Sequence, residues 1–142
     1  MITRRRTHIR WLAAACIACF AGTATWAQDE ALTQRVRFKK GTSSATMNGT
    51  IKGYQTMDYI VAGRKGQQAK VSLTTRAKAT YFNITAPGKT EAFFKGSDTQ
   101  TQYEGVLPED GDYRIRVYMV RQDARRNESA SFRLEIVTAS TP

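Results

Sequence analysis

The most constraining feature of this sequence is the alternation of apolar and polar residues in segment 113–120. Apolar side chains occupy every second position, namely Tyr113, Ile115, Val117 and Met119. Arg114, Arg116 and Tyr118 occupy the positions between them. Successive side chains of a β-strand point to opposite faces of its sheet, so this pattern predicts a strand with one buried and one wet face.

Similar patterns recur through the rest of the chain. Phe132, Leu134 and Ile136 alternate with charged residues, and Val71 and Leu73 alternate with polar ones. Further short strands are expected at 36–38, 46–51, 58–61, 80–85, 91–94 and 103–107, whereas 28–35 is expected to be a frayed turn or a tail. Glycine-containing turn signals stand at 64–67, 86–88, 95–98 and 108–111. Eight or nine short strands separated by such turns predict an all-β fold, an antiparallel β-sandwich.

The first 27 residues have the order of a secretory signal peptide. Four arginines within the first ten residues precede an apolar stretch at 11–21 and the small-residue end Thr25-Trp26-Ala27. The apolar stretch is about half the length that spans a bilayer. A twin-arginine signal and a lipoprotein box ending at Cys16 fit the segment less well. We therefore expect a signal peptide at 1–27 and one exported, periplasmic domain at 28–142.

The composition of the remaining 115 residues excludes several classes of function. All His, Cys and Trp residues lie in segment 1–27, as do four of the 22 Lys and Arg residues. The formal charge therefore falls from +10 to +6. Without His or Cys, the domain has no Ser/His/Asp or Cys/His nucleophilic machinery and no imidazole or thiolate metal site. We expect no cofactor, no metal and no catalytic activity.

Three arginines gather in the polar segment 121–128, between the two best strands. Arg121 and Arg125 are spaced so that one helical turn aligns their guanidiniums, which match carboxylate or phosphate oxygens. The alternative is that Asp123 and Glu128 pair with the arginines and keep the loop soluble. Composition alone favours that alternative.

Tyr54 follows a strand and a glycine, which makes it a candidate exposed aromatic on a loop. A core tyrosine that closes a strand end is equally consistent with the sequence.

The acidic turn with Glu109, Asp110 and Asp112 is the one remaining route to catalysis or calcium binding, but its spacing suits local turn hydrogen bonds better. The basic residues are scattered, which argues against a nucleic-acid surface.

Five segments resemble the periplasmic inhibitors of goose-type lysozyme: 36–45, 49–54, 65–67, 111–117 and 121–127. The most specific are Ile51-Lys52-Gly53-Tyr54 and Arg121-Gln122-Asp123-Ala124-Arg125-Arg126-Asn127. The similarity covers nearly all of the mature chain in the same order. The arrangement also resembles, more loosely, the β-sandwich of pre-peptidase C-terminal domains. Segment 90–102 departs most from the inhibitor family, and Asn48 stands where a Ser is expected.

This resemblance implies an inhibitor that inserts a tyrosine and loop arginines into the acidic substrate cleft of a goose-type lysozyme. The matching positions here are Tyr54, Arg121 and Arg125. Asp123, Arg126 and Asn127 match neighbouring positions of the same loop. The rival hypotheses are a glycan- or peptidoglycan-binding module without inhibitory activity, and an enzyme that uses carboxylates alone.

Overall fold

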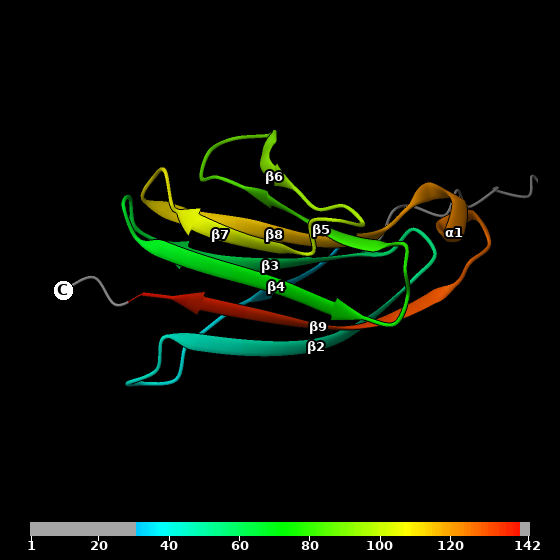
Figure 1. Ribbon diagram of the computed structural model, residues 1–142, viewed down its shortest axis with the longest axis horizontal. Helices are drawn as coiled ribbons and strands as arrows, with labels where there is room; N and C mark the ends of the chain where they lie inside the picture. The colour runs from blue at the N-terminus through cyan, green and yellow to red at the C-terminus, as the bar shows by residue number, and fades with distance from the viewer. Residues whose placement is uncertain (1–30, 140–142) are drawn as a thin grey trace, which may run out of the picture.

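The computed structural model describes residues 31–139, which form two stacked β-sheets (Figure 1). The expected signal peptide at 1–27 lies outside the described residues. The described chain contains nine strands and one short helix. They are β1 (Ala31–Arg35), β2 (Ser44–Lys52), β3 (Thr56–Gly63), β4 (Gln68–Thr75), β5 (Thr80–Thr85), β6 (Ala92–Lys95), β7 (Gln102–Val106), β8 (Gly111–Met119), α1 (Arg121–Arg125) and β9 (Ser129–Thr138).

The strands divide into a five-stranded sheet and a four-stranded sheet. The five-stranded sheet has the order β1-β3-β8-β5-β6, and the four-stranded sheet has the order β2-β9-β4-β7. Every pair of neighbouring strands is antiparallel except β1 and β3, which are parallel. The predicted β-sandwich is therefore confirmed.

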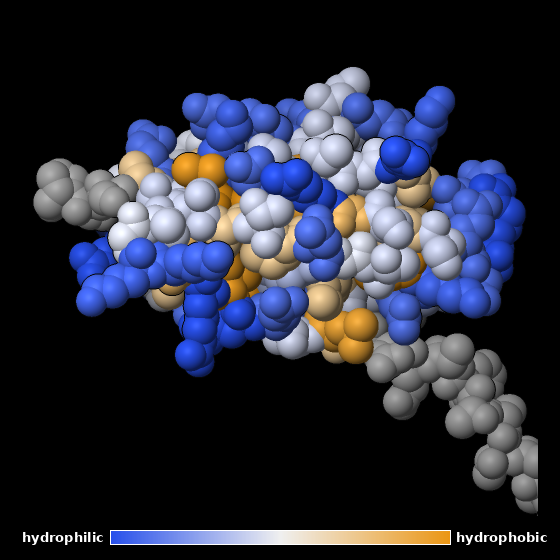
Figure 2. All heavy atoms as spheres, turned by 90° about the horizontal axis from the view of Figure 1, so that it is seen from below, coloured by the Kyte–Doolittle hydropathy of each residue, from blue (hydrophilic) through white to orange (hydrophobic). Residues whose placement is uncertain are grey.

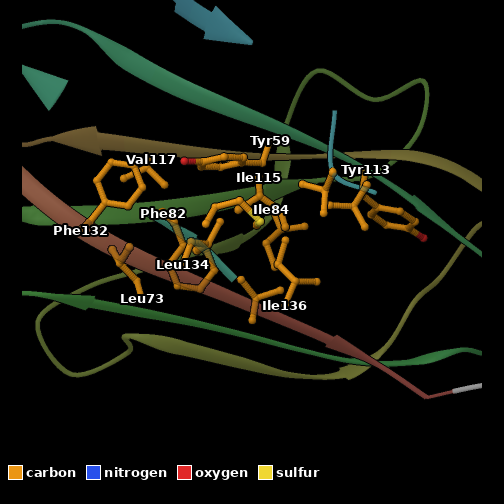
Figure 3. Close-up of a cluster of buried hydrophobic side chains, with 14 of the residues drawn as sticks. Tyr59, Leu73, Phe82, Ile84, Tyr113, Ile115, Val117, Phe132, Leu134 and Ile136 are labelled. Carbon is orange, nitrogen blue, oxygen red and sulfur yellow. The ribbon is translucent and has the colours of Figure 1, made fainter. Parts of the chain in front are cut away.

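The alternation in the sequence determines which side chains fill the space between the sheets. The alternating apolar positions of β8 (113, 115, 117 and 119) and β9 (130, 132, 134 and 136) are all buried, and they form one core with apolar residues of β3, β4 and β5 (Figure 3). Tyr59 of β3 meets Phe132 of β9 edge to face, with ring centroids 6.3 Å apart. Full burial of such side chains contributes about 1.5–3 kcal/mol each, so this layer holds the two sheets together.

The N-terminal strand differs from the prediction. Residues 31–35 form β1 at the edge of the five-stranded sheet, whereas 36–38 lies outside any strand. Val36 is nevertheless buried, and its N–H donates to the carbonyl of Ile60 (2.9 Å), which extends the β1 ladder by one residue. All five side chains of β1 are exposed, so the strand depends on backbone pairing with β3 and carries no apolar alternation to reveal it.

Two connections at one end of the sandwich cross from one sheet to the other. The turn at 53–55 leads from β2 in the four-stranded sheet to β3 in the five-stranded sheet. The segment with α1 leads from β8 back to β9 in the four-stranded sheet. Figure 1 shows α1 at the end of the molecule opposite the C-terminus. Within residues 31–139, no helix has the length and hydropathy needed to cross a membrane.

Candidate functional site

The helix α1 begins immediately after β8 and makes a single turn. The N–H groups of Asp123 and Ala124 both donate to the carbonyl of Val120, and Ala124 is buried against the end of the sandwich. Arg121 and Arg125, four residues apart, lie on the same side of this turn and are exposed. The predicted helical alignment of these two arginines is confirmed.

The helix ends in a left-handed residue, Asn127, whose φ is 55°. Its N–H donates to the carbonyl of Ala124 (3.0 Å), and the N–H of Glu128 donates to the carbonyl of Asp123 (3.3 Å). These two bonds are those of the Schellman motif, which satisfies carbonyls at a helix C-terminus. Asn tolerates this conformation better than most residues. Asn127 therefore shapes the loop.

Arg126 is held by two carboxylates of its own loop. Its Nη2 lies 2.5 Å from Oδ1 of Asp123, and its Nε donates to Oε1 of Glu128 at 2.7 Å. The expected pairing of the loop acids with an arginine thus holds for Arg126. It does not extend to the others: among the described residues, no ion pair involves Arg121 or Arg125. Within residues 31–139, the guanidiniums of Arg121 and Arg125 therefore have no ion-pair partner, whereas the guanidinium of Arg126 stabilises the loop.

Tyr54 lies at the tip of a tight turn and is 45% exposed, so the alternative of a core tyrosine is wrong. The turn is closed by the N–H of Gln55, which donates to the carbonyl of Lys52 (3.0 Å). Gly53 has a φ of 58°, a conformation that costs little only for glycine. Tyr54 is therefore presented outward by a fixed turn.

The Tyr54 turn and the α1 loop are joined to each other. The buried Gly53 donates its N–H to the carbonyl of Glu128 (2.9 Å). A Cβ at position 53 would lie 2.7 Å from the side-chain Oδ1 of Asn127 and 3.5 Å from the carbonyl oxygen of Ala124, so the turn lies directly against the α1 loop. Tyr54 and the α1 arginines thus belong to one rigid end of the molecule. On the face drawn in Figure 2, hydrophilic residues gather at this end.

A hollow of about 710 Å³ adjoins this end, and we call it the Tyr54 hollow. The turn residues 53–56 and Arg121 line it, together with Asn83 of β5 and Arg116 and Tyr118 of β8. Arg116 and Tyr118 occupy the predicted wet face of their strand, but no sequence motif gave them a role. No sequence pattern placed Asn83 beside them, because only the pairing of β5 with β8 brings these residues together.

An ion pair between the half-exposed Arg116 and the buried Asp58 lies beside the Tyr54 hollow. The side chain of Asp58 is only 6% exposed, and Nε and Nη2 of Arg116 donate to its two oxygens at 2.7 Å each. These hydrogen bonds raise the pKa of Arg116 above its usual value. The bidentate geometry fixes the guanidinium in one orientation.

The three carboxylates of the acidic turn, the alternative catalytic or calcium site, each interact with a residue outside the turn. Asp112 forms an ion pair with Arg35, and Asp110 accepts the backbone N–H of Lys65 (2.9 Å). Glu109 lies 3.6 Å from the amine of Lys89. Within residues 31–139, no group of three or more His, Cys, Asp or Glu side chains is placed to hold a metal ion.

Comparison with known proteins adds independent information. No protein-family model matches the chain. The chain is 35% identical over 106 residues to an Escherichia coli K12 protein named inhibitor of g-type lysozyme, a match covering 71% of this chain and 77% of that protein.

Several solved structures are also similar. PliG of Aeromonas hydrophila, a periplasmic inhibitor of g-type lysozyme, has 33% identity and a TM-score of 0.73 over 78% of this chain and 98% of its own. Salmonella Typhimurium PliG has 30% identity and a TM-score of 0.63, covering 76% and 98%. The pre-peptidase C-terminal domain of Bacillus anthracis collagenase has 15% identity and a TM-score of 0.54, covering 75% and 94%, a likeness of fold alone.

Proposed function

We propose that this chain blocks the substrate cleft of a g-type lysozyme with Tyr54, Arg121 and Arg125. The chain belongs to the family of inhibitors of g-type lysozyme. The family membership confirms the resemblance drawn from the sequence. The relatives are named for inhibition and described as periplasmic, so the chain is a periplasmic inhibitor and not an enzyme.

One observation carries the proposal for these three residues. Tyr54 and the two free guanidiniums project from connections that are hydrogen-bonded to each other, as the bond from Gly53 to Glu128 shows. Groups held in place before binding lose little conformational freedom on association. A lysozyme cleaves glycosides with carboxylates in its cleft, and guanidiniums form charge-assisted hydrogen bonds with such groups.

Asp123, Arg126 and Asn127 contribute by shaping the loop. Arg126 is engaged by Asp123 and Glu128, and Asn127 provides the left-handed helix end. Among the three loop arginines, we therefore assign contact with the lysozyme to Arg121 and Arg125. Loss of Arg126 is expected to act indirectly, through disorder of the loop.

The test is inhibition of a goose-type lysozyme by single alanine variants. Truncating one partner of a desolvated charge pair costs about 2–5 kcal/mol, so Arg121→Ala and Arg125→Ala should each raise the inhibition constant by about 30-fold or more. Arg133→Ala is the matched control, because it removes the same charge from an exposed position of β9. The melting temperature should stay nearly unchanged in all three variants, since the residues are exposed.

Full inhibition by the Arg121→Ala/Arg125→Ala double variant would refute the assignment of these residues. Absence of inhibition by the wild-type protein would refute the function itself. In that case, retention of the protein by purified peptidoglycan would support the rival hypothesis of a glycan-binding module.

A further inference from the structure

The Tyr54 hollow faces any partner that Tyr54 and Arg121 contact, because both residues line it. Protein interfaces are packed at their centre to the density of protein interiors. A void of about 710 Å³ between two contact residues would forfeit those packing contacts on both sides. A segment of the partner that enters the hollow when the two residues are engaged would recover these contacts.

The groups around the hollow are fixed before binding. Arg116 is held bidentately by the buried Asp58. Tyr118 donates its hydroxyl hydrogen to Oδ1 of Asn83 (3.4 Å), and its ring packs edge-on against that of Tyr81, with centroids 6.4 Å apart. These side chains come from two adjacent strands, which are more rigid supports than loops.

Two of the side chains that line the hollow, those of Asn83 and Arg121, can donate hydrogen bonds to an occupant. With Oδ1 of Asn83 used by Tyr118, the amide nitrogen of Asn83 has two hydrogens to donate. Arg121 has five donors and, within the described chain, no ion-pair partner. The carboxylate of Asp58 beside the hollow is already neutralised by Arg116. An occupant that supplies acceptor oxygens therefore fits this hollow best.

We infer that the Tyr54 hollow is a second contact region of the inhibitor, which receives an acceptor-bearing segment from the rim of the goose-type lysozyme cleft. Asn83 is its central donor. This inference rests on the proposed function, because Tyr54 and Arg121 bring the hollow to the lysozyme. It adds a determinant of specificity on β5 and β8, outside the two loops that enter the cleft.

The decisive variant is Asn83→Asp, which is nearly isosteric. It keeps an acceptor for Tyr118 but replaces two donor hydrogens by a negative charge. The matched control is Asn48→Asp on β2, an exposed residue that lines a separate hollow of about 920 Å³ beside Arg133. Both variants lower the net charge by one, so a general electrostatic effect would be equal in the two.

The measurement is the inhibition constant against a goose-type lysozyme, with the melting temperature of each variant as a check on folding. Asn83→Asp should weaken inhibition by about tenfold or more, whereas Asn48→Asp should change it by less than about twofold. Asn83→Ala, which removes the donor without adding charge, should weaken inhibition by about two- to tenfold. This second variant decides the question if Asn83→Asp lowers the melting temperature.

Equal inhibition by wild type, Asn83→Asp and Asn83→Ala would overturn the second contact region. That outcome is distinct from failure of the proposed function. If the wild type inhibits, Arg121→Ala does not, and both Asn83 variants inhibit as well as the wild type, the function and the loop contact stand while the role of Asn83 falls. If the wild type fails to inhibit, both fall together.

Discussion

Replacing Gly53 by alanine tests whether the Tyr54 turn and the α1 loop form one unit. The φ of 58° at this position costs a residue with a Cβ about 1–2 kcal/mol. The new Cβ would also stand 2.7 Å from Oδ1 of Asn127, so the Asn127 side chain must turn away. An off-rotamer displacement of that kind costs about 0.5–1.5 kcal/mol. Gly53→Ala should therefore lower the free energy of unfolding by about 1.5–3.5 kcal/mol.

The matched background is Asn127→Gly. Glycine keeps the left-handed helix end and removes the oxygen that the alanine would meet. In this background, Gly53→Ala should cost only the backbone part, about 1–2 kcal/mol. The difference between the two costs is the coupling between the turn and the loop.

Urea unfolding of the four variants of this cycle measures the coupling, and inhibition assays on the same proteins follow its effect on function. Gly53→Ala should also weaken inhibition, because it shifts Tyr54 relative to Arg121. The same loss of stability in both backgrounds would refute the contact between the turn and the loop. A loss below about 0.5 kcal/mol would refute the backbone argument as well.

Two further predictions concern stability at the opposite end of β8. Tyr113 accepts the N–H of Glu109 (2.9 Å) and donates to its carbonyl (2.7 Å), so Tyr113→Phe should cost about 1–3 kcal/mol in urea unfolding; an unchanged midpoint would contradict this. The ion pair with Arg35 lowers the pKa of Asp112 below its ordinary value of 3.8, and a lowered folded-state pKa stabilises the fold above the unfolded-state pKa. Asp112→Asn should therefore be less stable than wild type at neutral pH, and the gap should close as the pH falls through the lowered pKa. A gap that does not narrow as the pH falls, as thermal melts would reveal, contradicts the ion-pair explanation.

The strands of the core were predictable because burial of one face leaves a period of two in the sequence. Segment 80–85 matches β5 at both ends, and 113–120 differs from β8 by a residue or two. β1 was not predictable, since an edge strand with five exposed side chains is specified by the backbone of its neighbour rather than by its own pattern.

The site was predictable in part for a similar reason. Tyr54, Arg121 and Arg125 lie in short segments whose local signals, a glycine turn and one helical turn, operate within a few residues. The sequence indicated that Asp123 and Glu128 could pair with loop arginines, but not that Arg126 is the arginine that they hold. Nor did it indicate the approach of Asn127 to Gly53. The Tyr54 hollow depends on the register of distant strands and required the fold.

Both connections that carry the site begin in one sheet and end in the other. The strands from which the two connections start therefore lie in different sheets. The distance between these strands is set by the thickness of the side-chain layer between the sheets, where Tyr59 meets Phe132. A lineage of such inhibitors that faces a changing lysozyme can thus adjust its fit by exchanging core residues of different volume. Divergence inside the sandwich is then a route to new target preference, even where every residue on the contact surface is retained.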